Sequence, residues 1–184
     1  MNYEDYIARQ LRQSPNTDLT NKCILQCVYC SRQSVFEGEP AGRDKVKLSQ
    51  DMPFSDFQKL CKSFRGINFC GQLSDPIYHP QFIKYLQHAS DLDKSIHVHT
   101  NGSGKKLSFW KQAFSISRTT EWTFGIDGLD QKTCNLHRIG QNFHQSFKAM
   151  LLGSQSHHKI CWQFIPFQHN EHQIPKAISI ARKH

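Results

Sequence analysis

From about residue 50 to its end, the chain alternates between two patterns of hydrophobic and polar positions. Apolar residues that recur every three or four positions predict amphipathic helices, and short runs rich in β-branched and aromatic residues predict strands. The predicted helices are 53–64, 80–92, 106–114, 142–153 and 174–184. The predicted strands are TDLTNK (17–22), GINFCG (66–71), SIHVHT (95–100), WTFGID (122–127) and KICWQFIPF (159–167). Strands separated by helices indicate βαβ crossovers and a parallel sheet.

This order of elements predicts the fold class. Five or six βα units are fewer than the eight of a closed barrel. We therefore expect an α/β fold, an open partial (β/α)5-6 barrel of parallel strands with the helices outside. Residues 17–184 are predicted to form this core domain, and residues 1–16 a helical extension at the N-terminus. Ligands of such folds bind at the loops that follow the strands.

Composition narrows the class of protein. The chain has 184 residues, of which 38% are hydrophobic and 21% charged, as in ordinary globular domains. No run of eighteen apolar residues and no secretory signal is visible, so contact with a membrane is not expected. Seven cysteines without a signal favour reduced thiols and a cytoplasmic location. The net charge of +8 is compatible with an RNA partner, although the basic residues are scattered.

The loop after the first predicted strand contains three cysteines in eight positions. Cys23, Cys27 and Cys30 form a C-x3-C-x2-C pattern with no fourth cysteine nearby. Structural zinc sites use four ligands, so zinc would need a further ligand such as a histidine. A 4Fe–4S cluster normally takes four thiolates, and three would leave one iron open to an exogenous ligand. We favour the cluster and keep the zinc site as an alternative.

The remaining cysteines and one histidine pair have simpler interpretations. The other four cysteines are predicted to be buried thiols, namely Cys61, Cys70, Cys134 and Cys161. Cys134 lies in a loop at the predicted active end of the barrel, where it could face a substrate. His97 and His99 share one face of their strand, and a packing role is favoured over metal binding.

The segment CILQCVYC resembles the signature of the radical S-adenosylmethionine (radical SAM) superfamily. In that family three cysteines hold a 4Fe–4S cluster, and the amino and carboxylate groups of S-adenosylmethionine (SAM) bind the fourth iron. The resemblance makes Cys23, Cys27 and Cys30 the cluster ligands and the catalytic residues, with Tyr29 as the aromatic residue that the family prefers there. It implies reductive cleavage of SAM to methionine and a 5′-deoxyadenosyl radical, which takes a hydrogen atom from the substrate.

Two further loops resemble SAM-binding segments of the same family. CGQLSDPIYHP is similar to the segment after the second strand that binds the methionine amino group, which makes Gly71 and Gln72 cofactor-binding. Gln72 replaces the commoner glutamate and can accept a hydrogen bond from the amine without adding charge. HTNGS resembles the Thr-Asn-Gly that follows the third strand, which implies SAM contacts by Thr100 and Asn101.

The last two motifs resemble the peptide-modifying branch, whose members usually carry a C-terminal SPASM or twitch domain. GIDGLDQKTCNLHRIGQNF is similar to its Asp-Gly, His, Arg and Phe pattern, with Asp127 in the site and Arg138 paired with the SAM carboxylate. Gly125 stands where a serine commonly touches the ribose. CWQFIPF resembles the last core strand, so Ile165 would flank the adenine. The resemblance covers about residues 17–175, with no cysteine-rich segment after it, and a minimal core is expected.

These observations favour a radical SAM enzyme with a large substrate. A partial barrel without a capping domain has a wide mouth, which suits a peptide or protein more than a small molecule. An external one-electron donor such as flavodoxin or ferredoxin is implied by the resemblance. An RNA-modifying radical SAM enzyme, a non-catalytic zinc-binding module and a core that binds SAM without turnover remain as alternatives.

Overall fold

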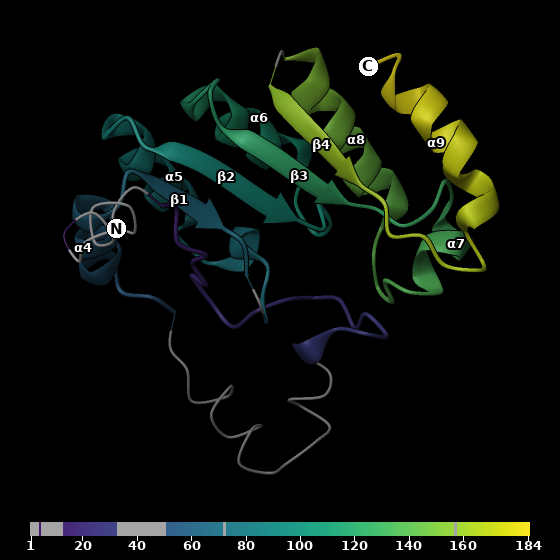
Figure 1. The fold of residues 1–184 in the computed structure, drawn as a ribbon, viewed down its shortest axis with the longest axis horizontal. Helices are drawn as coiled ribbons and strands as arrows, with labels where there is room; N and C mark the ends of the chain where they lie inside the picture. The colour runs from purple at the N-terminus through teal and green to yellow at the C-terminus, as the bar shows by residue number, and fades with distance from the viewer. Residues whose placement is uncertain (1–3, 5–12, 33–50, 72, 157) are drawn as a thin grey trace, which may run out of the picture.

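The computed structural model describes residues 4, 13–32, 51–71, 73–156 and 158–184 (Figure 1). Most of the predicted N-terminal helical extension lies outside these ranges. Gln72 also lies outside the described residues, so its role in SAM binding stays a prediction.

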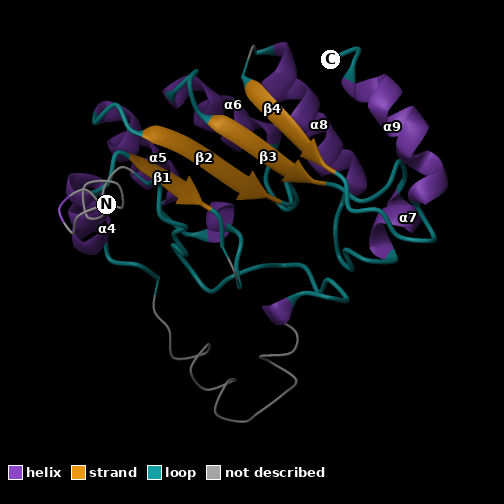
Figure 2. Cartoon of the chain, in the orientation of Figure 1, coloured by secondary structure: helices purple, strands orange, loops and turns teal. Residues whose placement is uncertain are grey.

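A single open sheet of four parallel strands forms the centre of the described chain. The strands are β1 (Gly66–Phe69), β2 (Ser95–Thr100), β3 (Glu121–Gly125) and β4 (Lys159–Gln163), and they are neighbours in the order β1-β2-β3-β4. All three pairings are parallel, so every strand ends at the same edge of the sheet (Figure 2). The predicted open, parallel α/β architecture is confirmed.

Helices connect the strands and cover one face of the sheet. Figure 1 shows α5, α6 and α8 side by side on that face. The longer helices are α4 (Phe54–Ser63), α5 (Phe82–Asp91), α6 (Leu107–Ile116), α8 (Phe143–Gln155) and α9 (Ile174–Ala181). The short ones are the α-helix α7 (Gln131–Asn135) and the 3-10 helices η1 (Pro76–Tyr78) and η2 (Glu171–Gln173), none of which the sequence pattern predicted. No helix among the described residues combines the length and the apolar character needed to span a bilayer.

The core follows from the two-residue period of the strands. Alternate side chains face the helices and are fully buried there, namely Ile67, Phe69, Val98, Trp122 and Phe124. Burying an apolar side chain of this size contributes about 1.5–3 kcal/mol. The positions between them are mostly polar and lie on the opposite, concave face, for example His97, His99, Thr123 and Gln163. The sheet therefore has one apolar face for the helices and one polar face for a ligand.

The prediction of a first strand at residues 17–22 is wrong. Residues 17–22 do not extend the sheet, and the segment meets β1 only through one parallel bridge, between Asn16 and Asn68. Its polar side chains bond to loops instead, as where the Thr20 hydroxyl donates to Asp51 Oδ1 over 2.6 Å.

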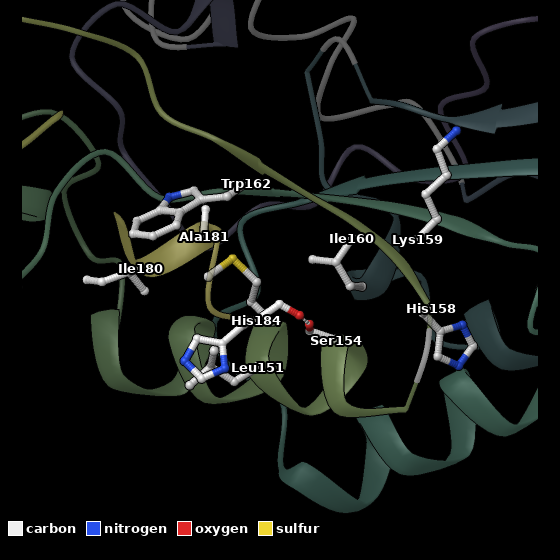
Figure 3. Close-up of a pocket in the computed structure, with 10 residues that line it drawn as sticks. Leu151, Ser154, His158, Lys159, Ile160, Trp162, Ile180, Ala181 and His184 are labelled. Carbon is white, nitrogen blue, oxygen red and sulfur yellow. Dashed lines mark hydrogen bonds between the residues drawn. The ribbon is translucent and has the colours of Figure 1, made fainter. Parts of the chain in front are cut away.

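A groove lies beside the edge strand β4. It encloses about 310 Å³ between β4, α8 and α9. Figure 3 shows Trp162 of β4 close to Ala181 and Ile180 of α9, with Ile160 of β4 further along the groove. None of the predicted site residues lines it.

Candidate active site

The three predicted cluster cysteines line one cavity at the carboxyl ends of the strands. Cys23, Cys27 and Cys30 enclose about 330 Å³ together with residues from the ends of all four strands or the loops that follow them. The loop is fixed to a distant segment by two backbone bonds. Gln26 N–H donates to Ile139 O over 2.9 Å, and Val28 N–H donates to His137 O over 3.0 Å. The three cysteines, which lie close together in sequence, are thus held against the strand ends.

The sulfur atoms lie in a poorly solvated, partly acidic environment. Burial, with the nearby Asp75 carboxylate, raises the pKa of the Cys23 thiol to about 11. Burial also raises the pKa of Cys27. Cys23 Sγ accepts long hydrogen bonds from Leu25 N–H (3.5 Å) and Asn101 Nδ2 (3.8 Å). Without a bound cation these two thiols therefore keep their protons at neutral pH.

No three His, Cys, Asp or Glu side chains in the described ranges are placed as ligands of a single metal ion. A 4Fe–4S cluster makes a different demand, because each thiolate binds a different iron. Three thiols spread around one cavity fit such a cluster. N–H donors directed at sulfur are among the contacts that set the reduction potential of a cluster.

Asp75 connects the loops after β1 and β2. Its Oδ2 accepts a hydrogen bond from Thr100 Oγ1 (3.0 Å) and another from Asn101 N–H (2.7 Å). Its Oδ1 accepts from Ile77 N–H, which caps η1. Burial raises the pKa of this carboxyl to about 6. Asp75 therefore positions Thr100 and Asn101 at the cavity wall.

Gln141 joins the loops after β2 and β3. Its side-chain amide donates to the carbonyl oxygens of Asn101 (2.9 Å) and Gly125 (2.8 Å). The Ser146 hydroxyl reinforces this contact by donating to the same Asn101 carbonyl over 2.7 Å. These buried bonds hold the cavity wall rigid.

Asp127 is the centre of a buried ionic network. Its Oδ2 accepts from Arg138 Nε (2.6 Å) and faces His137 Nδ1 at 2.8 Å, while its Oδ1 accepts from Ile165 N–H (2.8 Å). Burial alone would raise the pKa of Asp127, but the hydrogen bond with His137 and the Arg138 charge outweigh it and lower the pKa. The network fixes the Arg138 side chain at the cavity.

Gly125 makes room for that guanidinium group. A Cβ atom at this position would lie 2.6 Å from Arg138 Nη2 and 2.8 Å from its Cζ. The terminal nitrogens of Arg138 make no hydrogen bond to the described residues, and Arg138 lines the cavity. Its Nε is thus held by the protein while its far end remains available to a ligand.

Comparison with known proteins identifies the family. The sequence model of the radical SAM superfamily matches residues 17–178. The chain belongs to the radical SAM superfamily. None of the curated proteins that were compared matches it.

Solved structures of SuiB from Streptococcus suis share this radical SAM fold. The similarity to SuiB has a TM-score of 0.68 at 14% identity, and to SuiB bound to the precursor peptide SuiA 0.71 at 14%. For SuiB bound to S-adenosylmethionine the values are 0.68 and 13%. The comparisons cover 88–95% of this chain but only 35–38% of the SuiB chains, so the chain spans little more than a third of their length. At this identity they show the fold alone.

The predicted radical SAM site residues fall into two groups. Those that line the cavity are Cys23, Cys27, Cys30, Gly71, Thr100, Asn101 and Arg138. Asp127 lies behind Arg138, and Ile165 contacts Asp127 through its backbone. Tyr29 is 78% exposed, with its ring stacked 6.0 Å from the rings of both His137 and Phe167. Contacts of these residues with a cofactor remain predictions.

The interpretation of the other cysteines needs correction. Cys134 is buried as predicted, but it lies on α7 rather than in a loop and does not face a substrate; burial raises its pKa to about 12. Cys70 is not fully buried, since it follows β1 at the strand end and lines the cavity. Cys161 is exposed, because it lies on the concave face in register with Thr123. Cys61 is buried as predicted.

Several cavity residues were not singled out from the sequence. Arg32 lines the cavity and donates to the backbone carbonyls of Asn21 and Leu73, which ties the cysteine loop to the loop after β1. Its position two residues after Cys30 is the signal that could have found it. His99 also lines the cavity, and burial lowers its pKa. Its neighbour His97 makes a 2.8 Å hydrogen bond with Thr123 Oγ1.

Proposed function

We propose that this radical SAM protein is an enzyme that binds a 4Fe–4S cluster and SAM and abstracts a hydrogen atom from a peptide or protein. The observation that carries the proposal is the single cavity shared by Cys23, Cys27, Cys30 and the strand ends. Its volume of about 330 Å³ lies within the range of small-molecule sites, about 300–1,000 Å³. When bound, the cluster would supply the electron that cleaves SAM.

The chain's own residues would prepare the cluster site. The raised pKa values of Cys23 and Cys27 mean that both thiols release a proton when iron binds. The N–H groups of Leu25 and Asn101 would then donate to the Cys23 thiolate, which carries more negative charge than the thiol. The backbone bonds from Gln26 and Val28 would keep the loop in place before and after this change.

Arg138 is the residue best placed to hold the SAM carboxylate. Its guanidinium is always charged, and its terminal nitrogens lie at the cavity. The bond from its Nε to Asp127 orients the group in advance and reduces the entropy lost on binding. Gly71 lines the same cavity and can present backbone groups to the rest of the methionine portion, whereas both backbone groups of Asn101 are bonded within the protein. Gly125 has no side chain to reach the ribose.

A peptide substrate is supported by the polar concave face and by one relative. SuiB has been solved with its precursor peptide SuiA. In the present chain His99 and Gln163 lie on the polar face of the sheet and line the cavity. Neutral hydrogen-bonding side chains of this kind match the amide groups of a peptide better than the phosphates of RNA, which favour Lys and Arg.

The cluster and the open iron can be tested spectroscopically. The protein would be reconstituted anaerobically with iron and sulfide, reduced with dithionite, and measured by electron paramagnetic resonance with and without SAM. We expect a brown protein whose spectrum changes when SAM is added, because SAM binds one iron directly. The Arg138→Met variant should need more SAM for the same change. A colourless protein that retains zinc would contradict the proposal.

The substrate class can be tested with a cell extract divided into three portions. One portion is left intact, one is treated with protease and one with ribonuclease, and each treating enzyme is removed afterwards. We expect the extract to stimulate formation of 5′-deoxyadenosine by the reduced protein, and we expect only protease to abolish this effect. Loss after ribonuclease alone would contradict the peptide substrate and favour RNA.

A further inference from the structure

The fold brings a fourth cysteine to the wall of the cavity. In sequence no other cysteine lies near Cys23, Cys27 and Cys30, but Cys70, directly after β1, lines the same cavity. None of the remaining cysteines lines it. A 4Fe–4S cluster held by protein alone normally takes four thiolates, one for each iron. The cavity therefore offers as many thiols as the cluster has irons.

The direction of the Cys70 side chain follows from β1. Ile67 and Phe69 face the helices, so the two-residue period of the strand turns Cys70 toward the opposite, polar face. The register pairs Phe69 with Val98, which places position 70 beside His99 of β2. His99 lines the cavity as well. The end of a strand thus directs the thiol at the cavity.

Two hydrogen bonds join the loop that begins at Cys70 to both ends of the cysteine loop. Asp75 N–H donates to Lys22 O over 3.0 Å, just before the first of the three cysteines. The Arg32 guanidinium donates to Leu73 O over 2.8 Å, just after the last of them. The two loops cannot separate without breaking both bonds. The fourth thiol is therefore held at the same cavity as the other three.

The Cys70 thiol is available to a metal. It is half-buried, and it makes no hydrogen bond to the described residues. Burial, and then the charges of Asp18 and Asp75, raise its pKa, so the thiol keeps its proton until a metal replaces it. Burial and then the same Asp75 charge raise the pKa of Cys23. The Asp75 carboxylate therefore lies near both Cys70 and a predicted cluster ligand.

The four thiols fit a cluster with an exchangeable ligand better than a site for one ion. In the described ranges no three potential ligands are placed around a single metal ion. A cluster spreads its thiolates over four irons, so it accepts this wider spacing. The terminal nitrogens of Arg138 line the same cavity without a hydrogen bond to the described residues, which leaves an anchor for the SAM carboxylate. The fourth iron thus has two candidate ligands, one from the chain and one from the cofactor.

We propose that Cys70 binds the fourth iron of the cluster when SAM is absent and that SAM displaces it. The inference rests on the proposed function, because it requires the cluster. In the exchange the Cys70 thiolate leaves the iron and takes up a proton, while the ammonium group of SAM gives up a proton. One iron–sulfur bond breaks, bonds from iron to the SAM nitrogen and carboxylate oxygen form, and no electron is transferred. Part of the SAM binding energy is therefore used to release Cys70.

The test uses the protein reconstituted anaerobically with sulfide and Mössbauer-active iron. Mössbauer spectra of the oxidised cluster are recorded with and without SAM, because an iron with nitrogen and oxygen ligands has a higher isomer shift than one held by sulfur alone. The Kd for SAM is measured by equilibrium dialysis. Both measurements compare the wild type with Cys70→Ala and with a matched control, Cys161→Ala, whose thiol is exposed but does not line the cavity.

We expect the wild-type cluster without SAM to show four irons with sulfur ligands only, and one distinct iron to appear when SAM is added. Cys70→Ala should show the distinct iron already without SAM. Its Kd for SAM should fall about tenfold, because no ligand of the chain has to leave. The Cys161→Ala control should match the wild type in both measurements.

Two kinds of result separate this inference from the proposed function. A distinct iron in the wild type without SAM, or a Kd for SAM that is unchanged or raised in Cys70→Ala, would overturn the role of Cys70 and leave the proposed function intact. A wild-type protein without a 4Fe–4S spectrum, or with four sulfur-ligated irons even at saturating SAM, would contradict the proposed function and the inference with it.

Discussion

Replacing Gly125 with alanine should destabilise the protein by displacing Arg138 rather than by a rigid clash. The new Cβ would lie 2.6–2.9 Å from three guanidinium atoms, which belong to the end of a flexible side chain. The side chain can move, but it then loses the 2.6 Å bond from its Nε to Asp127. Asp127 is fully buried, and Arg138 is only 13% exposed, so solvent does not replace this bond well.

The magnitude follows from the bond that is lost. A hydrogen bond to a charged group contributes about 1.5–3 kcal/mol. Asp127 keeps its contacts with His137 and Ile165, so the larger cost of an unpaired buried charge is not expected. Alanine also restricts the unfolded chain, which stabilises the fold by about 0.4–1 kcal/mol. We therefore expect Gly125→Ala to lower the free energy of unfolding by about 0.5–2.6 kcal/mol.

A double-mutant cycle with Arg138→Ala isolates this effect. Urea unfolding of the metal-free protein would be followed by tryptophan fluorescence for the wild type, both single variants and the double variant. In the Arg138→Ala background no guanidinium is left to displace, so only the effect on the unfolded chain remains and Gly125→Ala should stabilise the protein by about 0.4–1 kcal/mol. The coupling energy should be about 1.5–3 kcal/mol. An equal cost of Gly125→Ala in both backgrounds would refute the explanation for the glycine.

Three further predictions concern single residues of the same region. Because burial places the pKa of Asp75 at about 6, above the ordinary 3.8, its contribution to stability is full below about pH 4 and is lost as the pH rises through 6. This loss should amount to about 3 kcal/mol in all, of which about 2 kcal/mol falls between pH 4.5 and 7; urea unfolding at these two pH values should show it for the wild type and not for Asp75→Asn. Gly102→Ala should lower the Tm more than Gly140→Ala. Both glycines have positive φ, but a Cβ atom at Gly102 would lie 3.0 Å from the Phe124 ring, whereas at Gly140 the nearest atom would be Ile24 O at 3.3 Å; equal shifts would contradict this. Iodoacetamide should alkylate exposed Cys161 in the native protein well before buried Cys134, which peptide mass spectrometry can follow, and the reverse order would contradict the burial described.

The spacing of apolar residues along the chain predicted most of the fold, because the residues at these positions form the core. The strand 95–100 was predicted with the bounds that the structure gives, and its alternate residues face the helices. The stretch 17–22 was also predicted as a strand but forms none, and its Thr20 side chain bonds to Asp51. Local pattern cannot reveal such a partner, since it lies 31 residues away in sequence.

The site was predicted where its chemistry is local and missed where it depends on distant contacts. The three cysteines lie within eight residues, and their spacing alone indicated that they act together. The role of Asp75 depends on Thr100 and Asn101 in the next loop, and the need for glycine at 125 depends on the path of Arg138.

The central claim is that three thiols of one loop hold a cluster that cleaves SAM in the adjoining cavity. The most direct test is to incubate the reconstituted wild-type protein with dithionite and SAM, and to quantify 5′-deoxyadenosine against a Cys30→Ala variant. The account predicts that the wild-type protein forms 5′-deoxyadenosine and methionine in equal amounts and that the variant forms neither. Equal product from both proteins, or a stable brown cluster that leaves SAM intact even with the stimulating extract, would contradict it.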